Sequence, residues 1–220
     1  MTLQDAMTQR HTVRRFTSAK LSADTVRKLR ERTQVNNETY GLSIQLVTNH
    51  TDALNLFAKL FMSTNVRNYW ILAAPDSADC EEKLGYCGAD LMLYAQTLGL
   101  NTWWVGGTYN HKMQSFVMQG SKVMGILAVG YGKNAGKPHT SKQLASVSSY
   151  DGTMPEWFRS GVNAALLAPT ALGKQDFFLK GSGAAADLQC DGSSYSNVER
   201  GILKYHFELG AGKENFEWQR

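Results

Sequence analysis

The sequence predicts an α+β fold in which antiparallel or mixed sheets are flanked by helices. Helical and strand-like segments are mixed along the 220 residues without strict alternation, which disfavours a doubly wound parallel sheet. The composition is 43% hydrophobic and 19% charged, with nine Tyr, nine Phe and five Trp, as in a globular chain with a sizeable core. No apolar run reaches the roughly 18–20 residues that a membrane span needs.

Charge and cysteine content exclude several classes of protein. Cys80, Cys87 and Cys190 are odd in number and widely spaced, which predicts free thiols in a reducing cytoplasm. The N-terminus lacks the pattern of a secretory signal. The net charge of +4 is concentrated between Arg10 and Arg32, yet no aromatic residues are interleaved there as a nucleic-acid groove requires. We therefore expect no nucleic-acid or membrane partner.

The first part of the chain is expected to hold two long helices and four strands. Ser22 has the properties of a helix N-cap, and Gly99 those of the residue that ends an apolar helix over residues 88–98. Strand patterns cover residues 44–47, 70–74, 101–105 and 123–129.

The last part of the chain has a similar order of elements. Pro155 is expected at the first position of a helix that Pro169 terminates. A strand follows over residues 176–179. Asn197 is expected to cap the last helix and Gly210 to end it.

Several common motifs are absent or incomplete. Residues 130–135 read GYGKNA after a strand, but Pro138 follows closely, so the helix that a dinucleotide fingerprint requires cannot start there. No P-loop, zinc-type histidine spacing or nucleophile elbow occurs. Cys87 lies in an apolar segment, where packing is a better interpretation than nucleophilic catalysis.

Residues 10–16, RHTVRRF, combine cations and a hydroxyl. In an extended segment Arg10, Thr12 and Arg14 project to one face, an arrangement that suits a phosphate dianion. A solvated basic cluster is the alternative. The segment resembles the N-terminal signature of the FMN-dependent nitroreductase family, and this resemblance implies that Arg10, His11, Thr12 and Arg14 grip the FMN phosphate.

Residues 82–106 resemble the central helix of that family and the strand that follows it. The resemblance implies that this helix lies in the core and at the dimer seam. It also implies that the segment formed by Trp104, Val105, Gly106 and Gly107 approaches the flavin ring with its backbone amides; glycine permits such an approach. The residues from Val129 to Gly132 resemble the family's next turn, and Lys142 is then the basic residue that returns to the phosphate.

Residues 164–177 resemble the family pattern A-P-S-A-x-N-x-Q-P-W-x-F, displaced towards the C-terminus. Thr170 matches the Ser and Gln175 the Gln, whereas Gly173 replaces the Asn and Asp176 the Pro. This arrangement is similar to a subgroup of thermophile-type nitroreductases in which the usual dimer is fused into one chain. It implies a nitroreductase-like region over 1–220, divided into a half-unit at 1–150 that carries the phosphate motif and a shorter one at 151–220.

The two half-units also predict a specific packing. The segments Tyr94 to Gly99 and Tyr205 to Gly210 agree at Tyr, Leu and Gly. If the chain is an internal pseudo-dimer, these two helices pack on each other across a pseudo-twofold axis. The chain is then a monomer or a homodimer.

The resemblance implies an FMN-dependent oxidoreductase. Electrons would pass from NADH or NADPH through FMN to a nitroaromatic, a quinone or a similar small acceptor. No side-chain acid or base and no metal is required, so no catalytic residue is nominated. One alternative is a flavin-binding or flavin-storage protein without turnover, favoured if Trp103 or Trp104 blocks the ring. Another is a degenerate member that lacks FMN, suggested by Gly173 and Asp176.

Overall fold

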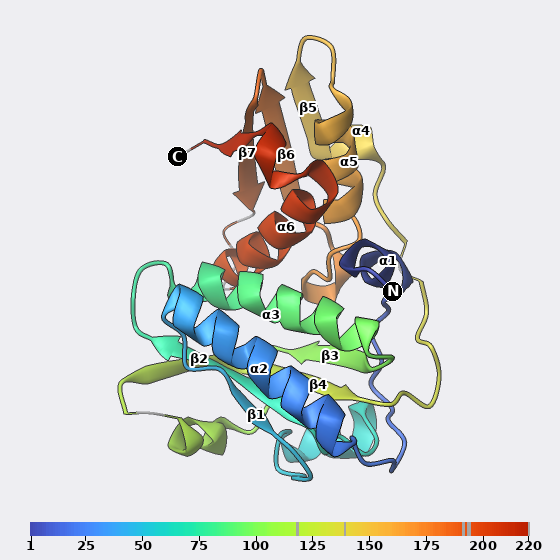
Figure 1. Ribbon diagram of the computed structural model, residues 1–220, viewed down its shortest axis with the longest axis vertical. Coiled ribbons are helices and arrows are strands. Elements are labelled where there is room, and N and C mark those ends of the chain that lie inside the picture. Colours follow the sequence, from blue (N-terminus) through green and yellow to red (C-terminus); the bar gives the residue numbers. More distant parts are fainter. Residues whose placement is uncertain (118, 139, 191, 193–194, 220) are drawn as a thin grey trace.

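Two four-stranded sheets lie towards opposite ends of the molecule, with helices packed between them (Figure 1). This computed structural model describes residues 1–117, 119–138, 140–190, 192 and 195–219. The α+β class, with sheets flanked by helices, is confirmed. None of the helices among these residues is long and apolar enough to cross a membrane.

The first sheet is antiparallel throughout and has the strand order β1-β2-β4-β3. Its strands are β1 (Gln45–Val47), β2 (Tyr69–Pro75), β3 (Asn101–Val105) and β4 (Ser121–Gly130). All four were expected from the sequence. β2 and β4 are the central pair, and their almost fully buried residues explain why both strands are nearly continuous apolar runs.

Three helices accompany this sheet: α1 (Leu3–Gln9), α2 (Ala23–Tyr40) and α3 (Cys80–Thr97). Ser22 caps α2 as predicted, because its side chain accepts a hydrogen bond from the Thr25 backbone. Gly99, with φ of +75°, follows the end of α3 as predicted. α3 begins well before residue 88, since its first turn is acidic, which stabilises a helix start but hides it from an apolar pattern.

The second sheet has the order β5-β6-β7-β8 and is mixed. β5 (Ser148–Asp151) is parallel to β6 (Phe177–Ser182), β7 (Ala185–Cys190) is antiparallel to β6, and β8 (Glu217–Trp218) is parallel to β7. The helices here are α4 (Leu144–Val147), α5 (Glu156–Ala165) and α6 (Ser196–Ala211). The short helical turns of the chain are Ala58–Met62, His111–Phe116, Ala171–Gly173 and Lys213–Asn215.

The expected ends of α6 were wrong at both positions. Tyr195, two residues before Asn197, occupies the N-cap position. At the other end the helix continues through Gly210 and stops at Gly212, whose φ is +77°. Gly210 instead serves packing, because a Cβ at this position would collide with Ala164 of α5.

α3 and α6 pack on each other, as the pseudo-dimer prediction requires (Figure 1). Their backbones approach closely at Gly85 and Gly201. A Cβ on Gly85 would collide with the Val198 carbonyl, and one on Gly201 with the Glu82 carbonyl. Val198 precedes Gly201 by three residues, and Glu82 precedes Gly85 by three. The two helices therefore make equivalent contacts with each other. At this crossing Gly85 lies opposite Gly201. The sequence comparison had instead aligned Tyr94 with Tyr205, so the equivalent positions of the two helices differ from those expected.

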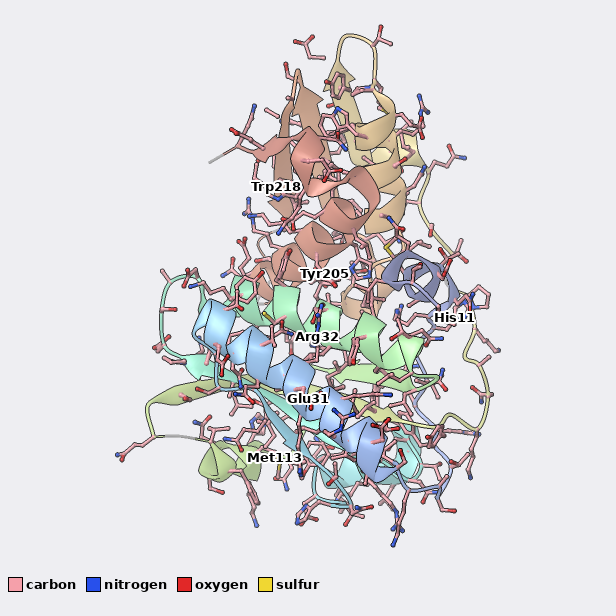
Figure 2. All side chains as sticks on the ribbon, viewed as in Figure 1. His11, Glu31, Arg32, Met113, Tyr205 and Trp218 are labelled. Atoms are coloured by element: carbon pink, nitrogen blue, oxygen red, sulfur yellow. The ribbon has the colours of Figure 1, made fainter. Side chains whose placement is uncertain are left out.

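Asp90 joins three helices at this seam. The carboxylate is 3% exposed and accepts two hydrogen bonds from Arg32 of α2, at 2.8 and 2.5 Å. Asn36 of α2 and Tyr205 of α6 donate to it at 2.9 and 2.7 Å. Arg32 and Tyr205 are labelled beside α3 in Figure 2. The network fixes α2 and α6 against α3.

Candidate functional site

The basic motif leaves α1 and runs along the first sheet. Thr12 forms a parallel bridge with Thr102 of β3, and the Val13 N–H donates to the Thr102 carbonyl at 3.0 Å. Farther on, Phe16 forms an antiparallel bridge with Gly132. The motif is therefore held against β3 and the turn after β4. Three segments that resemble the family, namely the basic motif, β3 and the turn after β4, therefore lie side by side.

Arg10 is the most unusual residue of the motif. Its side chain is buried, with the residue 5% exposed, and its Nε has no hydrogen-bond partner in the described part of the chain. Burial lowers the pKa of Arg10 well below its ordinary value, to about 10. A buried guanidinium with an unpartnered N–H is costly. Arg10 is therefore a buried cation whose Nε could donate a hydrogen bond to a bound anion.

The other members of the motif are more accessible. His11 and Thr12 are half-buried, and His11 lies close to α1 (Figure 2). Gly136 packs so tightly here that a Cβ on it would lie 2.6 Å from the His11 Cβ. Arg14 is exposed, with its guanidinium 5.7 Å from the centre of the Trp103 ring. The two arginines thus differ: Arg10 is buried, and Arg14 is stacked at the surface.

The two tryptophans of β3 belong to the core. The ring of Trp104 covers Gly88 of α3, where a Cβ would collide with it, and Trp103 packs on the opposite face of the sheet beneath Arg14. Val105 is buried, and its carbonyl lies 2.6 Å from the position of a Cβ on Gly125. These contacts account for both tryptophans structurally.

The Gly106–Gly107 turn is covered by a residue from the second half of the chain. A Cβ on Gly106 would lie 2.9 Å from Cε1 of Tyr195, and one on Gly107 would lie 3.1 Å from the Tyr195 hydroxyl. The Tyr195 side chain is 37% exposed. Tyr195, and neither tryptophan, is the aromatic side chain nearest to these two glycines.

Lys142, Thr170 and Gln175 form a second group. The Lys142 N–H donates to Gln175 Oε1 at 2.7 Å, and the Gln175 N–H donates to Thr170 Oγ1 at 3.0 Å. Gln175 is 2% exposed, and its Nε2 donates to the Leu166 carbonyl at 2.7 Å. Both ends of the Gln175 amide are therefore engaged within the protein. Lys142 Nζ forms an ion pair with Asp176 at 3.1 Å. Asp176 is the residue that stands where the family pattern has Pro.

Sequence analysis did not single out three residues of α6 or its N-cap: Tyr195, Glu199 and His206. Tyr195 precedes its first turn and covers the glycine turn, while the Glu199 carboxylate accepts a hydrogen bond from the Ala171 N–H next to Thr170. His206 is fully buried and has no partner for Nε2 among the described residues. The spacing of these three residues would place them on one helix face, but nothing in it indicated a ligand.

Two other chemistries find no support in these residues. Burial raises the pKa of the Cys87 thiol to about 12, so this cysteine is not a nucleophile at neutral pH. No group of three or more His, Cys, Asp or Glu able to hold a metal ion occurs within the described ranges.

Comparison with known structures supports the fold. A putative nitroreductase from Thermotoga maritima superimposes with a TM-score of 0.66 at 22% identity, covering 97% of this chain and 85% of that one. A nitroreductase-like protein from Streptococcus mutans gives a TM-score of 0.54 at 16% identity, covering 65% and 95%. A structure described as a putative NADH dehydrogenase/NAD(P)H nitroreductase from Bacteroides thetaiotaomicron gives 0.53 at 14%, covering 66% and 95%.

The family comparison covers nearly the whole chain. No curated protein gives a match. The family model described as "Putative TM nitroreductase" matches residues 2–211, which include the basic motif, the glycine turn, both sheets except β8, and α6. The two-sheet fold and the full-length match agree, and the chain belongs to this nitroreductase family.

Proposed function

We propose that the protein is an FMN-dependent oxidoreductase whose phosphate site is centred on Arg10. The observation that carries the proposal is the burial of this guanidinium, whose Nε has no hydrogen-bond partner among the described residues. Family membership supports a flavin as the ligand. A phosphate dianion would supply the missing charge, and a charge-assisted hydrogen bond to it contributes about 1.5–3 kcal/mol.

The residues fit FMN unevenly. Arg10 and Thr12 lie on the segment fixed to β3 and would hold the phosphate, with Arg14 available at the surface. Glycine at positions 106 and 107 would allow a planar ring to approach backbone N–H groups, but the Tyr195 side chain covers this turn and would have to move. Gln175 fits less well, because its amide already has partners on both sides. Lys142 is neutralised by Asp176, so we expect its contribution to the phosphate to be small.

Bound FMN would supply the redox chemistry, accepting a hydride from a nicotinamide and passing electrons to an acceptor. This chain's residues would then bind, orient and shield. Arg10 fixes the phosphate end, while the backbone N–H groups of Gly106 and Gly107 favour negative charge near the ring. We propose no catalytic acid or base among the residues of this site.

NADH or NADPH is the proposed electron donor, and a nitroaromatic, a quinone or a similar small molecule the acceptor. The description of the Bacteroides structure as an NAD(P)H nitroreductase supports this choice of donor. Donor and acceptor would occupy the same space over the ring in turn. Double-reciprocal plots of initial rate against donor concentration, at several fixed acceptor concentrations, should therefore give parallel lines. Intersecting lines would contradict a shared pocket.

A second candidate is a flavin-binding protein without turnover. Tyr195 favours it, because the phenol covers the turn at which a ring would be approached. Steady-state oxidation of NADH or NADPH by FMN-loaded protein, with a nitroaromatic present, separates the two. Turnover supports the oxidoreductase; stable binding without turnover supports storage.

The binding proposal is tested by titrating flavin-free protein with FMN. Arg10→Ala should weaken FMN by about tenfold or more, and Arg14→Ala by less, because Arg14 is exposed and screened by water. Arg30→Ala is the matched control, since this exposed arginine of α2 lies outside the site. If the Arg10→Ala/Arg14→Ala double variant binds FMN as tightly as the parent protein, the assignment is wrong.

A further inference from the structure

Large apolar side chains gather on one short segment of the surface. Nine such side chains are exposed among the described residues, and four of them belong to positions 56–61. Their exposed fractions range from 59% to 75%. We call these four residues the apolar ridge: Leu56, Phe57, Leu60 and Phe61. A single exposed Leu is ordinary, but a contiguous apolar patch indicates a contact surface.

The fold holds the apolar ridge in a fixed position. The ridge lies on and just before the helical turn Ala58–Met62, whose inner side buries Ala58 in the core under the first sheet. The Ala58 N–H donates to Asn55 Oδ1 at 2.9 Å. The rings of Phe57 and Phe61 contact each other, with 5.4 Å between their centres. The turn is therefore anchored from below while its outer side chains point to solvent.

A second exposed segment adjoins the ridge. Residues 53–55 pair with residues 108–110, where the Asn110 N–H donates to the Ala53 carbonyl at 2.9 Å. The helical turn His111–Phe116 follows directly, and its Phe116 side chain is also exposed. Both turns lie at the end of the molecule remote from the second sheet (Figure 1).

The segments that meet at this end contain almost no carboxylates. Residues 6–23 and 91–150 include no Asp or Glu, and residues 39–75 include only Asp52. The Asp52 carboxylate is already paired with Lys59 of the helical turn, at 3.3 Å. The surroundings of the ridge are therefore neutral or positively charged.

Cations lie on the segments at both ends of the ridge. Arg15 forms a parallel bridge with Thr64, two residues after the turn that carries the ridge, and it is exposed. Lys112 is exposed on the neighbouring turn. Neither cation forms an ion pair with a carboxylate among the described residues. The ridge is thus an apolar strip flanked by two unpaired positive charges.

This combination favours an anionic lipid surface over a second copy of the chain. In an isologous dimer across the ridge, the cations of one copy would face the same cations of the other, and such like-charge contacts are unfavourable. An anionic bilayer offers an apolar layer to the ridge and negative headgroups to Arg15 and Lys112. Binding at this depth, about 5–10 Å, requires no membrane-spanning helix.

We propose that the apolar ridge docks the protein on an anionic lipid bilayer, with its Leu and Phe side chains among the acyl chains and with Arg15 and Lys112 at the headgroups. The inference goes beyond the proposed function and does not require a bound flavin. It revises the expectation of no membrane partner. That expectation considered long apolar runs, whereas the ridge is a short segment that the fold holds at the surface.

Sedimentation with vesicles tests the apolar contribution. Vesicles of phosphatidylcholine mixed with phosphatidylglycerol should bind the parent protein about tenfold more strongly than phosphatidylcholine alone. Leu60→Ser/Phe61→Ser should reduce the partition coefficient by about tenfold or more, without lowering Tm. The matched control is Val35→Ser/Leu172→Ser, which removes two exposed apolar side chains outside the ridge and should leave partitioning unchanged.

The same assay tests the charges. Arg15→Gln/Lys112→Gln should weaken binding to the anionic vesicles by about tenfold and make the remaining binding less sensitive to salt. Lys174→Gln/Lys180→Gln removes the same charge from exposed positions in the second half of the chain. This control pair should bind as the parent does.

A fluorescence measurement keeps the ridge apolar and reports insertion directly. Phe61→Trp should gain emission that brominated acyl chains quench, whereas the emission gained by Val35→Trp should not be quenched. Equal quenching of both variants would contradict insertion of the ridge.

Three further results would overturn the proposal: no binding of the parent to anionic vesicles, equal losses in the ridge variant and its control, or a dimer of the parent in sedimentation velocity that Leu60→Ser/Phe61→Ser dissociates. The last result would identify a second copy as the occupant of the ridge.

Discussion

Arg10 combines a structural cost with a proposed function, and the two can be separated in flavin-free protein. Burial lowers the pKa of Arg10 to about 10, so the charged guanidinium costs the folded state stability at neutral pH, on the order of a few kcal/mol. Arg10→Met removes this cost, so the variant should be about 2–3 kcal/mol more stable by urea denaturation while binding FMN poorly. Arg14→Met should change stability by less than about 0.5 kcal/mol. A less stable Arg10→Met would mean that the arginine supports the fold.

His206 makes stability depend on pH. Its pKa is lowered from 6.5 to about 3 in the folded protein, so between these values the unfolded chain binds a proton that the native state does not. The free energy of unfolding must then fall as pH falls, by up to about 1.4 kcal/mol per unit. The free energies of unfolding of the parent and of His206→Gln should be measured by denaturation from pH 7 to pH 4.5. Their difference should change with pH at this slope. A constant difference would mean that His206 can be protonated in place.

Part of the proposed site can be nominated from the sequence for clear physical reasons. Arg10 and Thr12 are recognisable because phosphate chemistry needs those residue types at that spacing. Tyr195 is not, because its position over Gly106 and Gly107 depends on how the start of α6 packs against the turn after β3. Whether the Gln175 amide is free to bind a ligand also could not be predicted, since its partners Lys142 and Leu166 are known only from the fold.

The crossing of α3 and α6 depends on two glycines. In an unobstructed helix Gly→Ala stabilises by about 1 kcal/mol. At Gly201 the added Cβ would collide with the Glu82 carbonyl, and overpacking of this kind costs about 1–3 kcal/mol or more. Gly201→Ala should therefore lower stability in urea denaturation by about 2 kcal/mol, and Gly85→Ala similarly. An increase in stability would show that the helices are not in close contact there.

Asp90 should contribute more than any surface carboxylate. Asp90→Ala leaves Arg32, Asn36 and Tyr205 without their shared acceptor and should cost about 2–4 kcal/mol, because Arg32 keeps partial access to water. Asp24→Ala is the control: its pairs with Arg27 and Lys28 are exposed and should contribute less than about 1 kcal/mol. Equal losses in thermal or urea unfolding would contradict a role in fixing the helices.

Elements were predictable where local chemistry decides them. Ser22 caps α2 and Gly99 follows α3 because the backbone needs an acceptor at one end and a positive φ at the other. Gly210 looks the same in sequence but lies inside α6, where close packing on α5 requires it. β7 was missed although its buried Ala186 and Leu188 alternate with Asp187 and Gln189, because the strand is short and its pairing with β6 is a tertiary contact.

One strand, β5 (Ser148–Asp151), spans the proposed boundary between the two half-units. β5 begins before residue 150 but pairs with β6 of the second sheet, so the division at 150 and 151 falls inside a strand. The connection after β4 therefore carries the chain from one sheet to the other (Figure 1). We propose that the whole chain forms one pseudo-dimer, with the α3–α6 crossing at its seam.

A pseudo-dimer raises the question of how many flavins it binds. The basic motif occurs once, and its only buried arginine, Arg10, precedes the first sheet. In the corresponding approach to the second sheet, Lys142 is already paired with Asp176. We therefore predict one FMN per chain, bound at the first-half motif.

Titration of flavin-free protein, followed by absorbance and protein concentration, should reach its endpoint at one equivalent of FMN. Arg10→Ala provides the internal check, because it removes the anchor of the single site and should abolish the whole tight-binding signal. Two equal sites would instead give an endpoint at two equivalents and leave half of the signal in the variant. The residual binding of Arg10→Ala thus measures whether the second half of the chain holds a flavin of its own.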